Sequence, residues 1–196
     1  YIHFSVGNNE NVWIAQREGR AKDGIDKTDP ALLKMLAMGR LDLSLGESLS
    51  ELHIVPVAIS YEYDACDELK AEELYSIESR GSFTKTEKSD IQSIVAGMIG
   101  FKGKVHVAFG KELKLATDDP DEIAAMIDAQ ILENYAVSDT NFLALERLRQ
   151  DGLAPLHLLG DVIERQEITK QSRKRFEKRL KAIDSMVPVG RGQREL

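Results

Sequence analysis

Three short runs of consecutive apolar residues stand out along the chain, at residues 12–15, 54–59 and 105–109. They are rich in β-branched residues and do not alternate with polar ones, which is typical of strands buried on both faces of a mainly parallel sheet. Between and after these runs, apolar residues recur at helical spacing, which predicts helices over residues 30–38, 67–76, 89–99 and 121–135. Strands that alternate with helices predict an α/β fold, with a mainly parallel twisted sheet flanked by helices.

Several of the helical segments carry further signals. Asp29 is the expected N-cap of the first one, with Pro30 at the first helical position. In 89–99, one face of the helix is apolar and consists of Ile91, Ile94, Val95, Met98 and Ile99. In 121–135, the corresponding face consists of Ile123, Met126, Ile127, Ile131 and Tyr135.

The chain after Gly110 is expected to be helical. Strand patterns stop after Gly110, and residues 158–187 have the pattern of one long helix or a pair of helices. The polar stretch 78–88 is expected to be a mobile surface loop. The predicted organisation is therefore an α/β region over residues 1–115, followed by a helical extension over residues 116–196.

Composition and charge exclude several classes of function. The chain has 26 Lys and Arg against 33 Asp and Glu, and this net charge of −7 argues against a nucleic-acid-binding protein. The single cysteine, Cys66, excludes an intrachain disulfide and a Cys-rich zinc site, and it suits the cytoplasm. No apolar run approaches the ~18 residues of a membrane-spanning helix. The acidic residues show no metal-ligand spacing, so neither a metal nor a bound cofactor is expected.

The end of the chain differs from the rest, because residues from Lys170 onward include nine basic and three acidic side chains. One interpretation is a surface helix that is attracted to anionic lipid, which would give a peripheral membrane contact. The other is a helix that packs through its apolar stripe while its cations are solvated. We favour the second, because the stripe of Phe176, Leu180, Ile183 and Val187 is narrow and lacks Trp.

The most informative stretch for chemistry directly follows the first apolar run. Ligands of open α/β sheets bind at the carboxyl ends of strands. Glycines in such a loop let the backbone approach a phosphate closely, and arginine offers paired donors to it. The stretch spans residues 16–24 and contains three cations, two carboxylates and two glycines. Its part 17–22, here called the cationic segment, contains Arg17, Glu18, Gly19, Arg20 and Lys22. It predicts a site for a phosphate monoester; the alternative is a solvated turn whose charges pair with one another.

The second stretch of interest is the apolar run 54–59, which contains Pro56. Proline forfeits a ladder hydrogen bond, so it belongs at an edge strand, at a bulge or at the rim of a site. Taken alone, this run indicates an edge strand.

Taken together, the two stretches resemble the glycerolipid acyltransferase superfamily. Its third sequence block has Glu-Gly and then Arg after a buried strand, and Glu18, Gly19 and Arg20 are similar to it. Its fourth block is an apolar strand around proline, and Pro56 is similar to that proline. The stretches Tyr61-Glu62, Glu68-Leu69 and 105–110 are most similar to the glycerol-3-phosphate acyltransferase branch. The resemblance is close over residues 12–62, loose over 63–115 and slight in the helical extension.

The sequence departs from the family in two places. Arg20 follows Gly19 directly, whereas the family has one residue between them, so Arg17 or Lys22 could share its role. The family's first block, His-x-x-x-x-Asp, which supplies the general base and its orienting carboxylate, does not occur in these 196 residues. We therefore expect no catalytic residue in this chain, a catalytic block upstream of Tyr1, and no turnover by these residues alone.

The resemblance implies an O-acyltransferase of phospholipid synthesis that acts in the cytoplasm or peripherally at the inner membrane. An acyl thioester, of coenzyme A or acyl carrier protein, would donate a fatty acyl group to glycerol 3-phosphate or 1-acylglycerol 3-phosphate. Arg17, Arg20 and Lys22 would hold the acceptor phosphate, Glu18 and Gly19 would shape its pocket, and Pro56 would mark the rim. Two alternatives stay open: a module that binds phosphates or lipid headgroups without catalysis, and a helical interaction protein.

Overall fold

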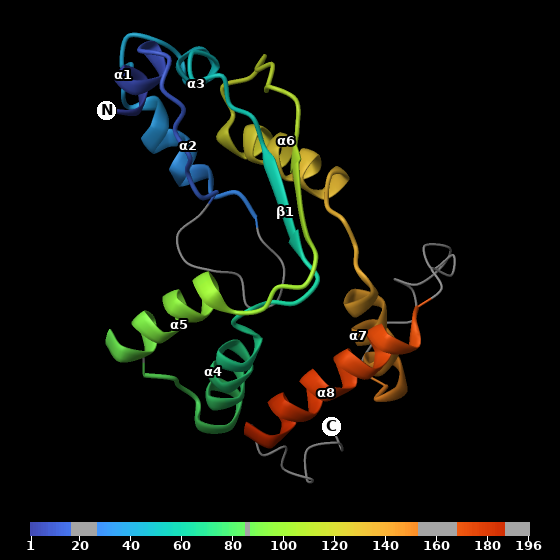
Figure 1. Ribbon diagram of the computed structural model, residues 1–196. Coiled ribbons are helices and arrows are strands. Elements are labelled where there is room, and N and C mark those ends of the chain that lie inside the picture. The colour runs from blue at the N-terminus through green and yellow to red at the C-terminus, as the bar shows by residue number, and fades with distance from the viewer. Residues whose placement is uncertain (17–26, 85–86, 153–167, 187–196) are drawn as a thin grey trace. The chain divides into compact units, whose positions relative to one another are not determined.

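The computed structural model describes residues 1–16, 27–84, 87–152 and 168–186. The fold is of mixed α/β class, as predicted from the sequence, and the chain divides into two compact units (Figure 1). Unit 1 comprises Tyr1–Ser60 and His106–Ala136, and unit 2 comprises Tyr61–Val105 and Val137–Leu196. Each unit is therefore assembled from two separate stretches of the chain.

The described helices of unit 1 are α1 (Ile2–Gly7), α2 (Pro30–Ala37), α3 (Leu45–Ser50) and α6 (Pro120–Glu133). All but α1 begin at a side-chain cap. Asp29 caps α2 by accepting a hydrogen bond from the backbone N–H of Ala31 at 2.8 Å, and Asp119 caps α6 in the same way. Both caps are followed by proline at the first helical position, where its missing N–H costs nothing. Helix α3 begins with a capping box formed by Ser44 and Glu47.

Two strands, β1 (Val57–Tyr61) and β2 (Val105–Phe109), form the sheet. They run antiparallel, because the N–H of Gly110 donates to the carbonyl of Pro56 and that of Leu113 to the carbonyl of Ile54. The parallel sheet expected from the sequence is not observed among the described residues, and the run 12–15 is not a strand.

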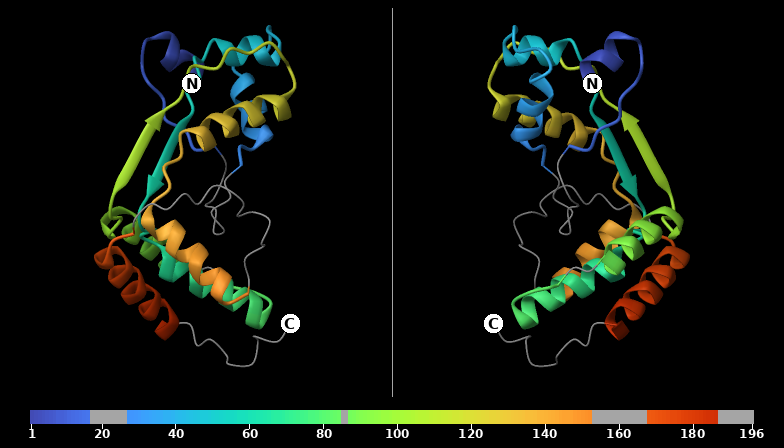
Figure 2. Two further views of the ribbon diagram at one scale, coloured as in Figure 1. Left: turned by 90° about the vertical axis from the view of Figure 1, so that its right-hand side faces the viewer. Right: turned by 90° about the vertical axis from the view of Figure 1, so that its left-hand side faces the viewer.

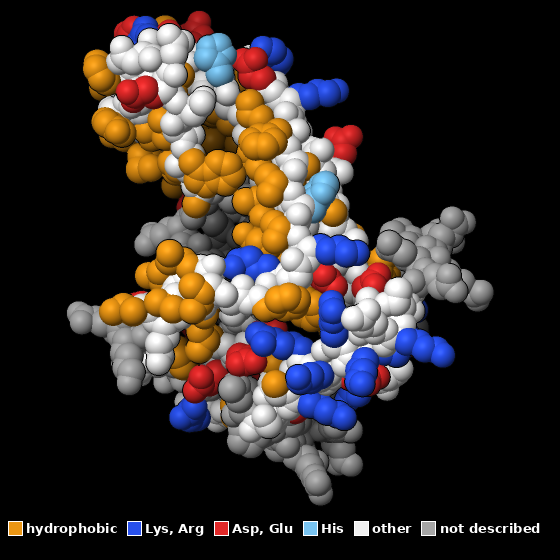
Figure 3. Space-filling model, viewed as in Figure 1, with side chains coloured by type: hydrophobic (Ala, Val, Ile, Leu, Met, Phe, Trp, Pro, Cys, Tyr) orange, Lys and Arg blue, Asp and Glu red, His pale blue; other side chains and the backbone are white. Residues whose placement is uncertain are grey.

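The expectation that these strands are buried on both faces was also wrong, because described helices cover only one face of the pair. Helix α6 runs along one side of the two strands, with α2 beside it (Figure 2). On that side Ala58 and Ser60 are buried. On the opposite side Val107 and Phe109 are 48% and 69% exposed. An antiparallel pair covered on one face needs no second layer, and its unalternated apolar sequence leaves a patch of apolar side chains open to solvent (Figure 3).

The core of unit 1 lies where α2, α3 and α6 meet. Leu33 of α2 is 2% exposed, and Leu49 of α3 and Ile123 of α6 are completely buried. Leu113, which follows β2, joins the same cluster and attaches the sheet to the helices. Burial of these side chains supplies the main driving force for folding this unit.

The described part of unit 2 consists of four helices. They are α4 (Asp67–Arg80), α5 (Glu87–Ile99), α7 (Asp139–Gln150) and α8 (Lys170–Met186). Helix α8 packs against α4 and α7, and ion pairs reinforce both contacts. Arg179 donates to Asp67 of α4 at 2.9 Å, and Arg173 donates to Glu146 of α7 at 2.8 Å. These pairs hold a strongly cationic helix in a defined orientation.

The helices expected over 30–38, 89–99 and 121–135 are confirmed within two residues at each end. The one expected over 67–76 continues to Arg80, where Gly81 with φ of 77° ends it, so the start of the expected 78–88 loop is helical. Part of the long C-terminal helix is confirmed as α8, while residues 153–167 lie outside the described part of the chain. Helix α7 falls in the region after Gly110 that was expected to be helical, whereas the sequence analysis missed α1 and α3.

Replacement of Leu33 by Ala tests the position of the core. The lost burial and the cavity left between α2 and α6 should lower the free energy of unfolding by about 2–5 kcal/mol. The matched control is Leu132→Ala in α6, because Leu132 is 74% exposed and its removal should change stability by less than about 0.5 kcal/mol. Urea unfolding followed by circular dichroism measures both variants, and equal effects would contradict this description of the core.

A second prediction concerns Arg40, which joins the end of α2 to the segment before α3. Its guanidinium donates to Asp42 at 2.8 and 3.0 Å and to Glu51 at 2.6 Å. The hydrogen bonds from Arg40 lower the pKa of Asp42 to about 2. The stabilisation from this charged form is therefore complete above the ordinary carboxyl pKa of about 3.9 and is lost as the pH falls towards 2.

Arg40→Met should move the Asp42 titration upward towards the ordinary value, as measured by carboxyl carbon NMR. Arg147→Met, which removes the partner of Asp151 in unit 2, is the control and should leave the Asp42 titration unchanged.

Candidate functional site

The residues of the predicted phosphate site fall into two groups. Arg17, Glu18, Gly19, Arg20 and Lys22, which form the cationic segment, all lie outside the described residues. Pro56 is described, and so are the two ends of the loop that contains the cationic segment. The structure therefore defines how this loop is attached to unit 1.

The two ends of the loop are joined by a backbone hydrogen bond. The N–H of Asp29 donates to the carbonyl of Gln16 at 3.0 Å, so the chain leaves and re-enters unit 1 at one place. Asp29 is also the N-cap of α2, which fixes its backbone. Closure of a loop at its base reduces the entropy that its residues must lose when they bind a ligand.

The exit of the loop is attached to α6 by Thr28. The backbone N–H and the hydroxyl of Thr28 both donate to Asp128 Oδ1, at 2.9 and 2.6 Å. Thr28 is 5% exposed, so these bonds are shielded from water. A carboxylate that accepts two shielded hydrogen bonds holds its partner firmly, because charge-assisted bonds are stronger than neutral ones. Thr28 and Asp128 are 100 residues apart in the sequence.

The entrance of the loop carries a buried polar atom. The side-chain nitrogen of Gln16 is shielded from solvent and has no hydrogen-bond partner in the described part of the chain. A buried donor without a partner costs free energy. It therefore marks the entrance as a place where an acceptor group would be favoured.

Pro56 lies at the start of an edge strand, as the sequence suggested. It is buried, it directly precedes β1, and its carbonyl accepts the hydrogen bond from the N–H of Gly110 at 2.8 Å. A Cβ at Gly110 would lie 2.5 Å from Gln130 Oε1 and 3.1 Å from the carbonyl oxygen of Pro56, so a side chain there would displace the end of Gln130. Gln130 Oε1 accepts a hydrogen bond from the N–H of Lys111 at 2.7 Å. Helix α6 thus contacts both the end of the loop, through Asp128, and the β1 end marked by Pro56, through Gln130.

The described histidines are not arranged for catalysis at this loop. His53 is exposed and pairs with Glu112 at 2.9 Å, which lowers the pKa of Glu112. His106, expected in a buried strand, is exposed on β2. His157 lies outside the described residues.

His3 lies between a serine hydroxyl and a carboxylate, as the histidine of a hydrolase triad does, but the group is not catalytic. Its ring lies 3.4 Å from the hydroxyl of Ser48 and 3.9 Å from the carboxylate of Glu51. Ser48, however, is completely buried and donates to the carbonyl of Ala37, and Glu51 is bound by Arg40. A hydroxyl that no substrate can reach is not a nucleophile, so these residues join α1 to α2 and α3.

Cys66 has a structural role. It is 6% exposed, and its Sγ lies 3.4 Å from the carbonyl of Ser93, which places it between α4 and α5. Such a buried thiol behaves as a small apolar side chain.

Unit 2 contains a pocket of about 430 Å³ that the sequence did not suggest. Lys104 and Arg175 line it together with the carboxylates of Glu62 and Asp139, so charges of both signs face the same space. Nearby, the ring of Tyr63 packs against that of Phe101 at a tilt of 42° with ring centroids 5.6 Å apart, and burial raises the pKa of the Tyr63 hydroxyl. Because the carboxylates offset the cations, this pocket favours a phosphate less than the cationic segment does.

No three His, Cys, Asp or Glu side chains in the described ranges gather closely enough to hold a metal ion. None of the described helices has the length and apolar character needed to cross a membrane.

Comparison with known proteins adds no constraint, since no family model, curated protein or solved structure matches this chain.

Sequence reasoning identified the cationic segment but missed its attachment. The signal for Asp128 is weak: a carboxylate borders the apolar face of α6, one position after the buried Ile127. An acid in that place often has a buried partner, but the spacing does not say which residue that partner is. Thr28 carries no signal of its own, because Thr before an Asp-Pro helix start is ordinary.

Thr28→Val removes the hydroxyl donor and keeps the shape of the side chain. Because Asp128 then loses one of its two described donors, the free energy of unfolding should fall by about 1–3 kcal/mol. Thr84→Val is the control, since Thr84 is exposed and its substitution should change stability by less than about 0.5 kcal/mol. Unfolding in urea compares the two, and a Thr28→Val chain as stable as the unmodified one would contradict the proposed attachment.

Proposed function

We propose that this chain is the acceptor-binding part of an O-acyltransferase of phospholipid synthesis. The acceptor is glycerol 3-phosphate or 1-acylglycerol 3-phosphate, and the donor is the acyl thioester of coenzyme A or acyl carrier protein. The proposal rests on the similarity of Glu18-Gly19-Arg20 and Pro56 to the family's third and fourth blocks. The single structural observation that carries it is the closed and anchored base of the loop that contains the cationic segment.

The charge distribution supports a phosphate ligand. Unit 1 contains eight of the 26 basic residues and 15 of the 33 acidic ones, so it accounts for the whole net charge of −7. Three of those eight cations, Arg17, Arg20 and Lys22, lie within six residues. In a unit that otherwise repels anions, such a concentration gives a phosphate one favourable place to bind.

Each residue of the segment has a role in the proposal. Arg17 and Arg20 present paired donors to the phosphate oxygens, and Lys22 adds a compact charge. Gly19 lets the backbone approach the phosphate, and Glu18 orients an arginine or accepts a hydrogen bond from a glycerol hydroxyl. Pro56 marks the strand end at the rim of this site.

The proposal includes a sheet larger than the β1–β2 pair. In the family that the chain resembles, a mainly parallel twisted sheet is flanked by helices, and residues 1–115 would form the back half of such a domain. The outer edges of β1 and β2 have no strand partner among the described residues, so further strands could add there.

The reaction transfers an acyl group from the sulfur of the thioester to a hydroxyl oxygen of the acceptor. A hydroxyl oxygen of the acceptor forms a bond to the thioester carbonyl carbon, the carbon–sulfur bond breaks, and the thiol leaves with a proton. The hydroxyl needs a base, which is worth ~10²–10⁴-fold in rate. Because His-x-x-x-x-Asp does not occur in these residues, the chain's part is to bind and orient the acceptor, and the base belongs to another segment of the enzyme.

The absence of His-x-x-x-x-Asp from these residues also favours one alternative to the acyltransferase function. A module that binds phosphates or lipid headgroups without turnover needs the cationic segment but no base. It differs from the acyltransferase in that no His-Asp pair would complete the site in the full-length protein.

Calorimetry with glycerol 3-phosphate tests the phosphate site. Arg20→Ala should weaken binding at least tenfold, because it removes charge-assisted hydrogen bonds worth about 1.5–3 kcal/mol. The matched control, Arg149→Ala, removes an exposed arginine of unit 2 and should leave the affinity unchanged. Glycerol without phosphate should not bind.

Equal affinities of the unmodified chain and of the Arg20→Ala and Arg17→Ala variants would rule out the phosphate role. No heat of binding from the unmodified chain would favour the helical interaction protein.

A further inference from the structure

Helix α5 presents its apolar face to solvent. Ile94 and Met98 are 60% and 75% exposed, and Phe101, just beyond the helix, is 64% exposed. Ile91, Val95 and Ile99 share this exposure. A helix in a water-soluble protein normally turns such a face to the core, so this arrangement points to a partner or an apolar phase.

The packing of α5 shows that this orientation is built in. Its opposite side consists of small residues that approach the start of α4 closely. Ser93 is 7% exposed and lies at Cys66, and a Cβ at Gly97 would be 3.8 Å from Cys66 Sγ. At Gly100 a Cβ would lie 2.8 Å from that of Ala65. The helix therefore cannot rotate its large apolar side chains inward without forcing them into this narrow contact.

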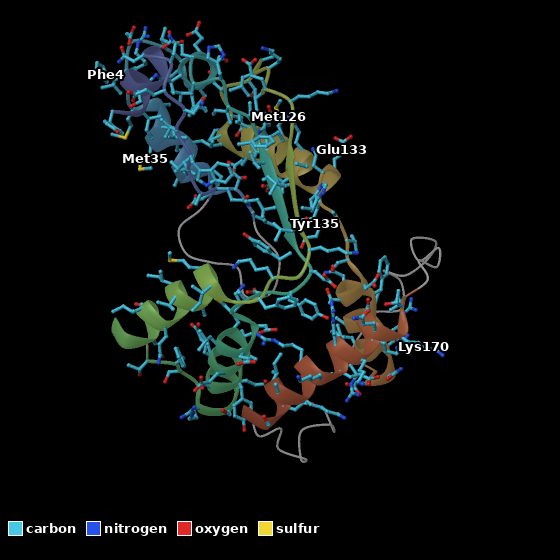
Figure 4. All side chains as sticks on the ribbon, viewed as in Figure 1. Phe4, Met35, Met126, Glu133, Tyr135 and Lys170 are labelled. Atoms are coloured by element: carbon cyan, nitrogen blue, oxygen red, sulfur yellow. The ribbon has the colours of Figure 1, made fainter. Side chains whose placement is uncertain are left out.

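Helix α8 presents a row of lysines to solvent. Lys170, Lys174, Lys178 and Lys181 are exposed and recur at intervals of four, four and three residues, which places them on one face of the helix. Lys170 extends outward from the first turn of α8 (Figure 4). None of the four forms an ion pair with a described residue, whereas Arg173 and Arg179 of the same helix bind Glu146 and Asp67. The arginines attach the helix to unit 2, and the lysine row remains available.

The two features lie on one face of unit 2. Apolar side chains gather over α5 and basic side chains over α8 in the same view (Figure 3). An apolar helix face beside a row of cations is complementary to an anionic bilayer, whose acyl chains accept the first and whose phosphates attract the second. A symmetric contact between two copies would bring both lysine rows into one interface, where they would repel.

We propose that unit 2 binds the surface of anionic membranes, with the apolar face of α5 inserted and the lysine row of α8 at the lipid phosphates. The described part of the chain has no spanning helix, so this contact is peripheral. It brings the chain to a lipid surface independently of the cationic segment of unit 1. In this proposal α8 packs on α4 and α7, as the favoured interpretation of the sequence has it, and its exposed lysines contact lipid phosphates instead of being only solvated.

Co-sedimentation of the full chain with vesicles tests the proposal. Vesicles with about one third phosphatidylglycerol in phosphatidylcholine should bind at least tenfold more tightly than pure phosphatidylcholine, and the difference should shrink at high salt. Met98→Asp should reduce binding at least tenfold, while Met38→Asp, at a comparably exposed methionine of unit 1, should not. Lys174→Glu with Lys178→Glu should abolish the preference for anionic vesicles, while Lys34→Glu with Lys111→Glu should retain it.

A direct measurement of insertion complements the variants. In a Trp13→Phe, Met98→Trp chain, the only tryptophan lies on α5, and its fluorescence should shift to shorter wavelength on anionic vesicles. The proposal is overturned by equal binding to both kinds of vesicle, by an unshifted emission, or by full binding of Met98→Asp. A change in oligomeric state of Met98→Asp without loss of vesicle binding would assign the face to a second copy instead.

Discussion

The double hydrogen bond from Thr28 to Asp128 is the constraint on which the rest of unit 1 depends. It joins the chain just before α2 to α6, and so it brings together two segments 100 residues apart. Once α2 and α6 are aligned, Leu33 and Ile123 share a core, and the loop that contains the cationic segment begins and ends at one place. The segment between Gln16 and Asp29 thereby gains a fixed base, which is what a small anionic ligand requires of its site.

Local signals in the sequence predicted the helices well. Asp29-Pro30 marked the start of α2, and the apolar periodicity of α6 marked its length, because caps and periodicity are properties of neighbouring residues. The sheet could not be predicted in the same way. The runs around Pro56 and at 105–109 are equally compatible with a doubly covered parallel sheet and with an antiparallel pair that has one open face. That choice depends on which helices cover the strands, which no local pattern records.

For helix α5, too, the local sequence pattern does not record the tertiary packing. Its apolar positions were identified correctly, but their orientation depends on Ser93 and Gly97, whose small size allows close contact with α4. In the candidate site, too, some residues could be recognised from the sequence and others could not. Arg17, Arg20 and Lys22 are recognisable from residue type and spacing, whereas Asp128 acquires its role only through tertiary contact. The two proposals, an acceptor phosphate site in unit 1 and a membrane surface in unit 2, rest on separate residues.

The most direct test of the central claim is an amide NMR titration of the chain with glycerol 3-phosphate. If the segment between Gln16 and Asp29 binds the phosphate, its amides, including that of Thr28, should show the largest changes in chemical shift. These changes should saturate together. Changes that are confined to unit 2, or spread over the surface without saturation, would contradict it.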